Sequence, residues 1–249
     1  MHDKTMQNNG RFLPVELVHE IFGYLSAIDI LHSFSNLNSY FQTILSNYDR
    51  YHINFQSCSK RDVYLICSRL RSNQIRSLIL SNKDDTPDQF QLIFSRWNIK
   101  DLTRLRAITF ISIEDNLLFK FINTFNNRYL QSLTIIPGNY SQRQLLKDSL
   151  KKFLEQGLQR LDVHDASCIN TQSTCHLKWL TVHDCEITEL HEILSSMPLL
   201  QSLQVTDYRS GQWIDMNKVP IQLKRLVLHL GIRYRLFHLI IIYQLTFRY

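Results

Sequence analysis

The sequence has little glycine and no close cysteine pair, and both shortages argue against whole classes of function. Six glycines in 249 residues are too few to suggest a glycine-rich phosphate loop, and no P-loop, dinucleotide fingerprint, nucleophile elbow or H-E-x-x-H motif occurs. The five cysteines include no C-x-x-C pair of the kind that zinc sites use. We therefore expect a protein that is not an enzyme and that holds no cofactor and no metal.

Acidic residues are missing from the last part of the chain. No Asp or Glu follows Asp215, and the six Lys and Arg residues beyond it account for the whole formal net charge of +6. The basic balance is therefore a property of the tail, and we expect no nucleic-acid partner. Residues 232–249 form an atypical apolar, basic tail that is too short to span a bilayer, so we expect no membrane partner. We interpret this tail as a truncated end or as a segment foreign to the rest of the chain.

A signal peptide is also missing from the first residues. The opening MHDKTMQNNG is polar, and we expect residues 1–11 to be a loose N-terminus. An odd number of cysteines without a secretory signal suits reduced thiols. We therefore expect a cytoplasmic or nuclear protein.

Residues 12–50 carry apolar residues at helical spacing. Pro14 is placed where the start of a helix tolerates proline, and Ser26 with Asp29 forms the capped start of a second helix. Three short helices are predicted from the following apolar faces: Leu17, Ile21, Phe22 and Leu25; Ile30, Leu31, Phe34 and Leu37; Phe41, Ile44 and Leu45. Helices this short bury too little to fold alone, so their apolar faces must be completed by something else.

The order of these residues resembles an F-box. The matching positions are Leu13-Pro14-x-Glu16-Leu17, Ile21-Phe22, Leu25, Asp29-Ile30-Leu31, and Phe41 with Ile44-Leu45. The chain departs from the pattern at Asn38, Ser39 and Tyr40, where many F-boxes carry a cysteine and a basic pair. The resemblance implies docking onto the Skp-type adaptor of a cullin–RING ubiquitin ligase. The implied adaptor-binding residues are Leu13, Pro14, Leu17, Ile21, Phe22, Leu25, Ile30 and Leu31. An ordinary helical bundle is the alternative.

A repeated pattern occupies most of the remaining chain. Ser59 and Asp62 predict a capped helix, so we expect residues 51–74 to be a linker helix. Seven L-x-x-L-x-L-like units then begin at Ile75, Leu105, Leu130, Leu158, Leu177, Leu200 and Leu223. They resemble leucine-rich repeats. We expect an α/β fold over residues 75–231: a leucine-rich-repeat solenoid with parallel strands on its concave face and helices and loops on its convex face.

A charged and aromatic cluster falls halfway along the predicted concave face. Its candidate target-binding residues are Arg160, Asp162, His164, Trp179, Thr181 and His183. Trp and Arg are enriched at binding hot spots, although a tryptophan that only shields the sheet is an equal alternative. Asp165 and Asp184 follow two of these histidines, and such a row could also be catalytic or pH-sensitive.

These features together predict the substrate-recognition subunit of an SCF-type E3 ubiquitin ligase. The N-terminal helices would dock the Skp-type adaptor, and the repeats would bind an unknown target protein. The alternative is a leucine-rich-repeat interaction scaffold with no link to ubiquitin transfer, whose N-terminal helices merely cap the repeats. A further rival is an enzyme or metal protein that uses the histidine row.

Overall fold

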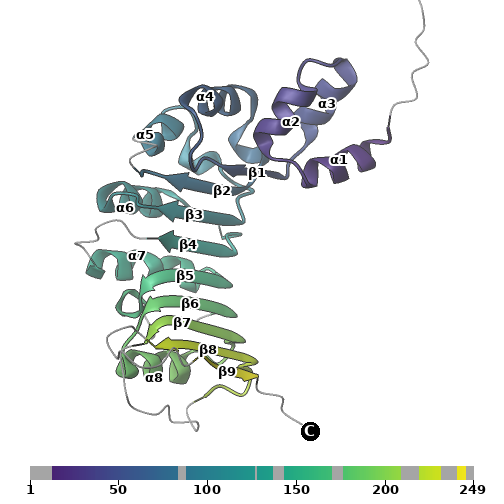
Figure 1. Ribbon diagram of the computed structural model, residues 1–249. Helices are drawn as coiled ribbons and strands as arrows, with labels where there is room; N and C mark the ends of the chain where they lie inside the picture. The colour runs from purple at the N-terminus through teal and green to yellow at the C-terminus, as the bar shows by residue number, and fades with distance from the viewer. Residues whose placement is uncertain are drawn as a thin grey trace, which may run out of the picture.

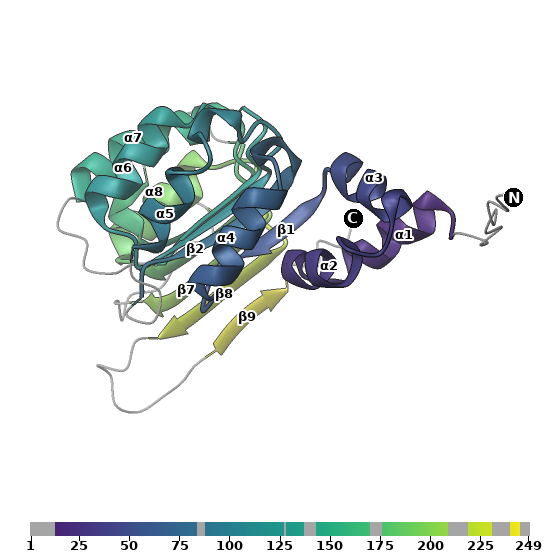
Figure 2. The same ribbon diagram turned by 90° about the horizontal axis from the view of Figure 1, so that it is seen from above.

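The computed structural model describes residues 13–83, 88–126, 128–136, 143–169, 176–208, 219–230 and 240–244. They form an α/β protein around one open nine-stranded sheet whose strands follow one another in chain order (Figure 1). Strands β1 to β8 pair in parallel, and β9 pairs antiparallel to β8. Helices α4 to α8 lie on one side of the sheet, and the described residues place no helix against its other face (Figure 2).

The strands arise from the seven repeated units. The seven units form β2 (Ile75–Ser81), β3 (Ala107–Ile111), β4 (Ser132–Ile136), β5 (Arg160–Asp165), β6 (Trp179–Asp184), β7 (Ser202–Tyr208) and β8 (Arg225–Leu230), and two further strands flank them, β1 (Tyr51–Asn54) and β9 (Ile240–Gln244). The second apolar position of each unit falls in one register, and all seven side chains are at most 1% exposed: Leu78, Ile108, Leu133, Leu161, Leu180, Leu203 and Leu226. The predicted parallel strands of residues 75–231 are confirmed.

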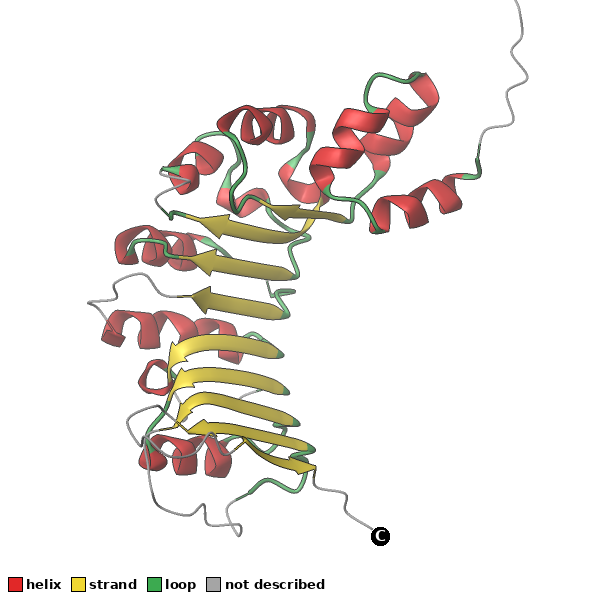
Figure 3. Ribbon diagram, in the orientation of Figure 1, coloured by secondary structure: helices red, strands yellow, loops and turns green. Residues whose placement is uncertain are grey.

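Helices and short turns connect the strands on the covered side, since parallel strands need crossover connections (Figure 3). They are α4 (Lys60–Arg69), η1 (Ser72–Gln74), α5 (Gln89–Phe94), η2 (Ile99–Asp101), α6 (Asp115–Thr124), α7 (Arg143–Glu155), η3 (Ala166–Cys168) and α8 (Ile187–Ser196). Aromatic rings join them to the sheet: Phe121 of α6 meets Phe110 of β3 at 5.1 Å between ring centroids. At Gly157, where φ is +96°, the chain leaves α7 in a conformation that glycine adopts without strain.

Three helices precede the sheet, as expected: α1 (Val15–Gly23), α2 (Ala27–Phe34) and α3 (Ser39–Asn47). Ser26 caps α2 by accepting a hydrogen bond from the Asp29 N–H at 3.1 Å. The inner faces of these helices belong to the same buried cluster as the strands. Phe22 packs against Tyr48 at 5.3 Å, and Tyr48 packs against Tyr51 of β1 at 4.8 Å between ring centroids.

The segment expected to be a linker helix differs from that expectation. Helix α4 is present, but residues 51–54 form β1, the first strand of the sheet. Tyr51, Ile53 and Phe55 are each at most 2% exposed and alternate with the exposed His52 and Asn54. This two-residue period is the signature of a strand, and it makes residues 51–54 part of the sheet. The N-terminal helices therefore lead directly into the sheet, without a linker helix between them.

The expected loose N-terminus, residues 1–11, lies outside the described residues, as do residues 232–239 and 245–249 of the tail. The described part of the tail is β9, which continues no repeat and pairs with β8 in the opposite direction.

Candidate functional site

An open apolar row runs along α1. Leu17 is 46% exposed and Ile21 39%, and their spacing of four places them on one face of α1, while Leu13, which is 49% exposed, lies two residues before the helix begins. Val15, at the start of α1, and Tyr24, just after its end, are exposed as well. Together these five residues form the "α1 face". The predicted adaptor contacts at Leu13, Leu17 and Ile21 are therefore accessible, and Pro14 at the start of α1 is exposed too.

The other predicted adaptor contacts are less accessible. Phe22, Ile30 and Leu31 are at most 2% exposed, and Leu25 is half-buried. Phe22 and Ile30 point inward because α1 and α2 complete a core with the protein's own strand β1, and α2 also packs on α4. In this conformation Phe22, Ile30 and Leu31 support the helices and offer almost no surface to a partner, which corrects the expectation from sequence.

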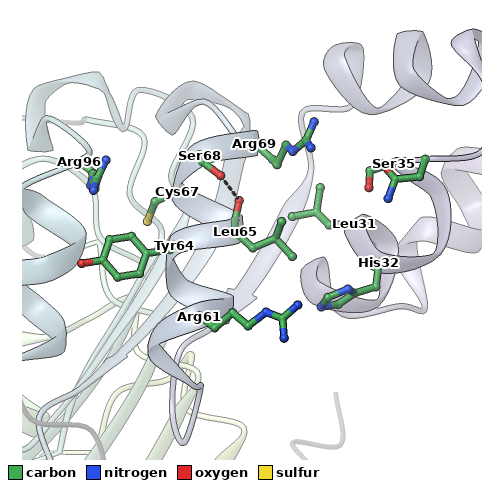
Figure 4. A pocket seen from close by; sticks show the side chains of 11 residues that line it. Leu31, His32, Ser35, Arg61, Tyr64, Leu65, Cys67, Ser68, Arg69 and Arg96 are labelled. Atoms are coloured by element: carbon green, nitrogen blue, oxygen red, sulfur yellow. Dashed lines mark hydrogen bonds between the residues drawn. The ribbon is translucent and has the colours of Figure 1, made fainter.

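A cleft of about 470 Å³ is lined by residues of α2 and α4, beside the place where these two helices pack. Figure 4 shows Leu31 of α2 and Leu65 of α4 pointing toward one another within it. Three arginines line the cleft: Arg61, Arg69 and Arg96. No carboxylate belongs to the described lining, although Asp62 lies next to it and meets the His32 ring at 3.6 Å. Arg96 stacks on the Tyr64 ring at 5.2 Å.

The predicted target-binding residues come together on the open face of the sheet. They occupy β5 and β6, where Arg160 is registered with Trp179 and Asp162 with Thr181. The Arg160 guanidinium lies 5.3 Å from the centre of the Trp179 ring, and Trp179 is 36% exposed. This pair presents a flat, partly desolvated cationic surface of the kind found at protein interfaces.

His183 holds a fixed position beside that pair. Its Nε2 lies 3.0 Å from Asp162 Oδ1, and its Nδ1 lies 3.0 Å from Thr206 Oγ1 on β7. The His164 ring stacks on it, with ring centroids 6.0 Å apart. Thr206 Oγ1 is also 3.2 Å from the His183 carbonyl oxygen, so its hydroxyl is tied to the same residue at two points. This arrangement fixes the orientation of the imidazole within the open face.

Sequence reasoning missed Thr206. Nothing in its local sequence marks it, and only the register of β6 against β7 brings it to the His183 ring. Asp165 and Asp184, which follow two of the histidines, are registered with one another at the ends of their strands.

Metal-binding groups do not gather in the part of the chain that the structure describes, where no three His, Cys, Asp or Glu side chains could hold an ion together. Cys175 lies outside that part. Cys185 is fully buried, and burial raises the pKa of its thiol to about 12, with smaller contributions from neighbouring carboxylates such as Glu189. The thiol is therefore protonated at neutral pH, which disfavours both nucleophilic attack and metal ligation.

No protein-family model matches the chain, and no curated protein matches it. Within the described residues, no helix combines the length and apolar character needed to cross a membrane.

Proposed function

We propose that this protein is the substrate-recognition subunit of an SCF-type, cullin–RING E3 ubiquitin ligase. In this proposal α1–α3 are an F-box that docks a Skp-type adaptor, and the sheet with its helices is a leucine-rich-repeat solenoid that holds the target. Catalysis would belong to the partner enzymes, and this chain would supply proximity.

The observation that carries the proposal is the α1 face. Leu13, Leu17 and Ile21 of the F-box-like pattern remain 39–49% exposed, whereas Val18, Phe22 and Ile30 of the same helical unit are at most 1% exposed. Solvated apolar rows of this kind mark interaction sites. The regular register of the seven L-x-x-L-x-L units supports the solenoid part, because stacked repeats place equivalent residues side by side.

The energetics limit how the adaptor would bind. A fully buried large apolar side chain contributes about 1.5–3 kcal/mol, and the five residues of the α1 face are already partly buried, so docking would gain roughly 4–8 kcal/mol. Association costs about 4–15 kcal/mol. The α1 face therefore supplies a large share of the binding energy, and the adaptor must make further contacts beside it.

A pull-down tests the proposal. The intact chain should retain a purified Skp-type adaptor, and Leu17→Asp with Ile21→Asp should abolish retention, because burying two carboxylates in an apolar contact is costly. The matched control is Ile136→Asp with Leu199→Asp, since these side chains are 41% and 45% exposed but lie on the sheet and its loops. Unchanged far-UV circular dichroism should accompany both variants. If the wild-type chain never retains the adaptor, the ligase assignment fails and the scaffold interpretation takes its place.

A further inference from the structure

One edge of the sheet carries a continuous row of long polar side chains. The second residues of the seven L-x-x-L-x-L units, which directly follow the first apolar residue, are joined by six backbone hydrogen bonds of 2.8–3.0 Å from N–H to carbonyl oxygen. The row consists of Arg76, Arg106, Gln131, Gln159, Lys178, Gln201 and Lys224, and we call it the basic ladder. Arg76, Gln131 and Lys224 are exposed, and the others are half-buried.

The charge of the ladder is of one sign. Four of its seven residues are cations, and the other three are glutamines. The adjacent row, in printed register across β2 to β8, reads Ser77, Ala107, Ser132, Arg160, Trp179, Ser202 and Arg225. No carboxylate occupies either row. Asp165 and Asp184 lie in register with one another at the opposite ends of β5 and β6.

This segregation follows from parallel topology. All eight parallel strands start at the same edge, which is the edge where the β2–β8 arrows begin in Figure 1. A basic or amide residue at the second position of each repeat therefore builds a single charged edge, although residues 1–215 together are formally neutral. The four cations lie along seven strands spaced about 4.8 Å apart, so the ladder is about 29 Å long.

We propose that the basic ladder binds an extended acidic segment of a partner protein. A strand-like peptide rises about 3.3 Å per residue, so a segment of about nine residues would span the ladder. Its carboxylates would meet the arginines and lysines, and the glutamine amides and serine hydroxyls would donate hydrogen bonds to the same groups. The inference rests on the proposed function, because it assigns a chemical class to the target.

A single-stranded nucleic acid fits this surface less well. Such ligands stack successive bases on exposed aromatic side chains. Two exposed aromatic residues lie at these rows, Trp179 and Tyr129, and the Arg160 and Arg106 guanidiniums already stack on their rings. An acidic protein segment needs only the cations and amides that are present.

The binding test uses a fluorescein-labelled peptide of about ten glutamates and measures fluorescence anisotropy with the full chain. The ladder variant carries Arg76→Gln, Arg106→Gln, Lys178→Gln and Lys224→Gln. An exposed cation–carboxylate pair contributes a factor of roughly 1.4–5 in affinity, so four lost pairs should weaken binding about 4- to 600-fold. Raising NaCl from about 50 to about 500 mM should weaken wild-type binding as well, because the Debye length falls.

The matched control removes the same charge from the helices of the covered side, through Lys60→Gln, Lys100→Gln, Lys120→Gln and Lys147→Gln. It should bind the peptide like wild type. A second variant keeps Arg106, whose Nη1 donates to the Tyr129 carbonyl oxygen at 3.0 Å, and serves if the fourfold change unfolds the chain. Circular dichroism and thermal melting check folding of every variant.

Three results would overturn the inference: no binding of the peptide by wild type, equal losses in the ladder and control variants, or tighter ladder-dependent binding of a thymidine oligonucleotide of equal charge. Retention of the adaptor is measured in parallel. A chain that retains the adaptor but ignores the peptide loses only this inference, and a chain that binds the peptide but not the adaptor loses only the ligase assignment.

Discussion

A single buried glutamine fastens the N-terminal helices to the sheet, and replacing it should be costly. Gln74 is 6% exposed, at the end of η1. Its Nε2 lies 3.1, 3.1 and 2.8 Å from the carbonyl oxygens of Leu45, Ser46 and Tyr48, at the end of α3. Its Oε1 accepts from the Arg71 N–H at 2.9 Å. The side chain therefore donates to carbonyl groups at the C-terminal end of α3, where the Leu45 carbonyl also accepts from the Tyr51 hydroxyl at 3.2 Å.

The magnitude follows from these contacts. An amide nitrogen has two protons, so Gln74 makes two donor bonds at a time and one acceptor bond. Three hydrogen bonds at about 1 kcal/mol each, with the buried Tyr48 carbonyl losing its donor while the Leu45 carbonyl keeps the Tyr51 hydroxyl, predict that Gln74→Ala lowers the free energy of unfolding by about 2–4 kcal/mol. For a chain of this size that corresponds to a melting temperature about 4–16 °C lower. Gln74→Glu should cost more, because a carboxylate donates nothing and would face three carbonyl oxygens.

Urea unfolding measures the effect, followed by circular dichroism and by tryptophan fluorescence, to which Trp97, 5% exposed between α5 and η2, contributes. Gln91→Ala is the control, since Gln91 is exposed on α5, and exposed positions usually change stability by less than about 0.5 kcal/mol. A loss below about 1 kcal/mol for Gln74→Ala, or a Gln74→Glu variant as stable as the control, would refute the reasoning about unsatisfied carbonyls.

Two further predictions concern α8 and its surroundings. Burial raises the pKa of Glu189 above its usual value, and Asp165 adds to the shift, so the folded state is penalised as pH rises through that raised pKa. Glu189→Gln keeps the acceptor for the Glu186 N–H, and it should raise the melting temperature near pH ~7 but not near pH ~4. Glu192→Gln, on the exposed side of α8, should change the melting temperature at neither pH. If Glu189→Gln changes the melting temperature equally at both pH values, the reasoning is contradicted. Because the Cys185 thiol is buried and its pKa is raised, iodoacetamide should label it only after unfolding, as judged by peptide mass spectrometry. Rapid labelling of the native protein would show that the thiol is accessible to solvent and would contradict this.

The strands were predictable because their signal is periodic. In each repeated unit the apolar residues are spaced for one buried face, and the structure places all seven units in one register. The capped starts at Ser26 and Ser59 were predictable for the same local reason, since each side chain accepts a hydrogen bond from a residue three positions on.

What the sequence did not reveal depends on neighbours that are distant along the chain. Strand β1 has an alternating pattern, but four residues are few, and its partner β2 begins 24 positions after β1 starts. Gln74 and Gln89 are buried because carbonyl groups far along the chain need donors, such as the Phe55 carbonyl oxygen, which lies 2.6 Å from Gln89 Nε2. A glutamine of this kind cannot be told from a surface glutamine until the fold is known.

The inward orientation of Phe22, Ile30 and Leu31 has the same origin. A helix pattern identifies which residues share an apolar face, but it does not say whether the chain itself or a second protein covers that face. Here β1 and α4 cover part of it, and the α1 face remains. Strand β1, which the sequence had been expected to place in a linker helix, decides which part of the apolar surface is covered by the chain itself and which part stays exposed.

The basic ladder lies at the same edge of the sheet as the helices that are proposed to dock the adaptor. Figures 1 and 2 both place α1–α3 beyond the edge at which strands β2–β8 begin, and the ladder starts there with Arg76. A target held along the ladder would therefore extend toward the helices that are proposed to dock the adaptor, and ligation by proximity needs that arrangement. Because the α1 face and the ladder share no residue, their two binding free energies should be additive. Combining Leu17→Asp and Ile21→Asp with the ladder variant should thus leave the loss of peptide affinity unchanged, and a larger loss would show that the helical unit itself contributes to the acidic-segment site.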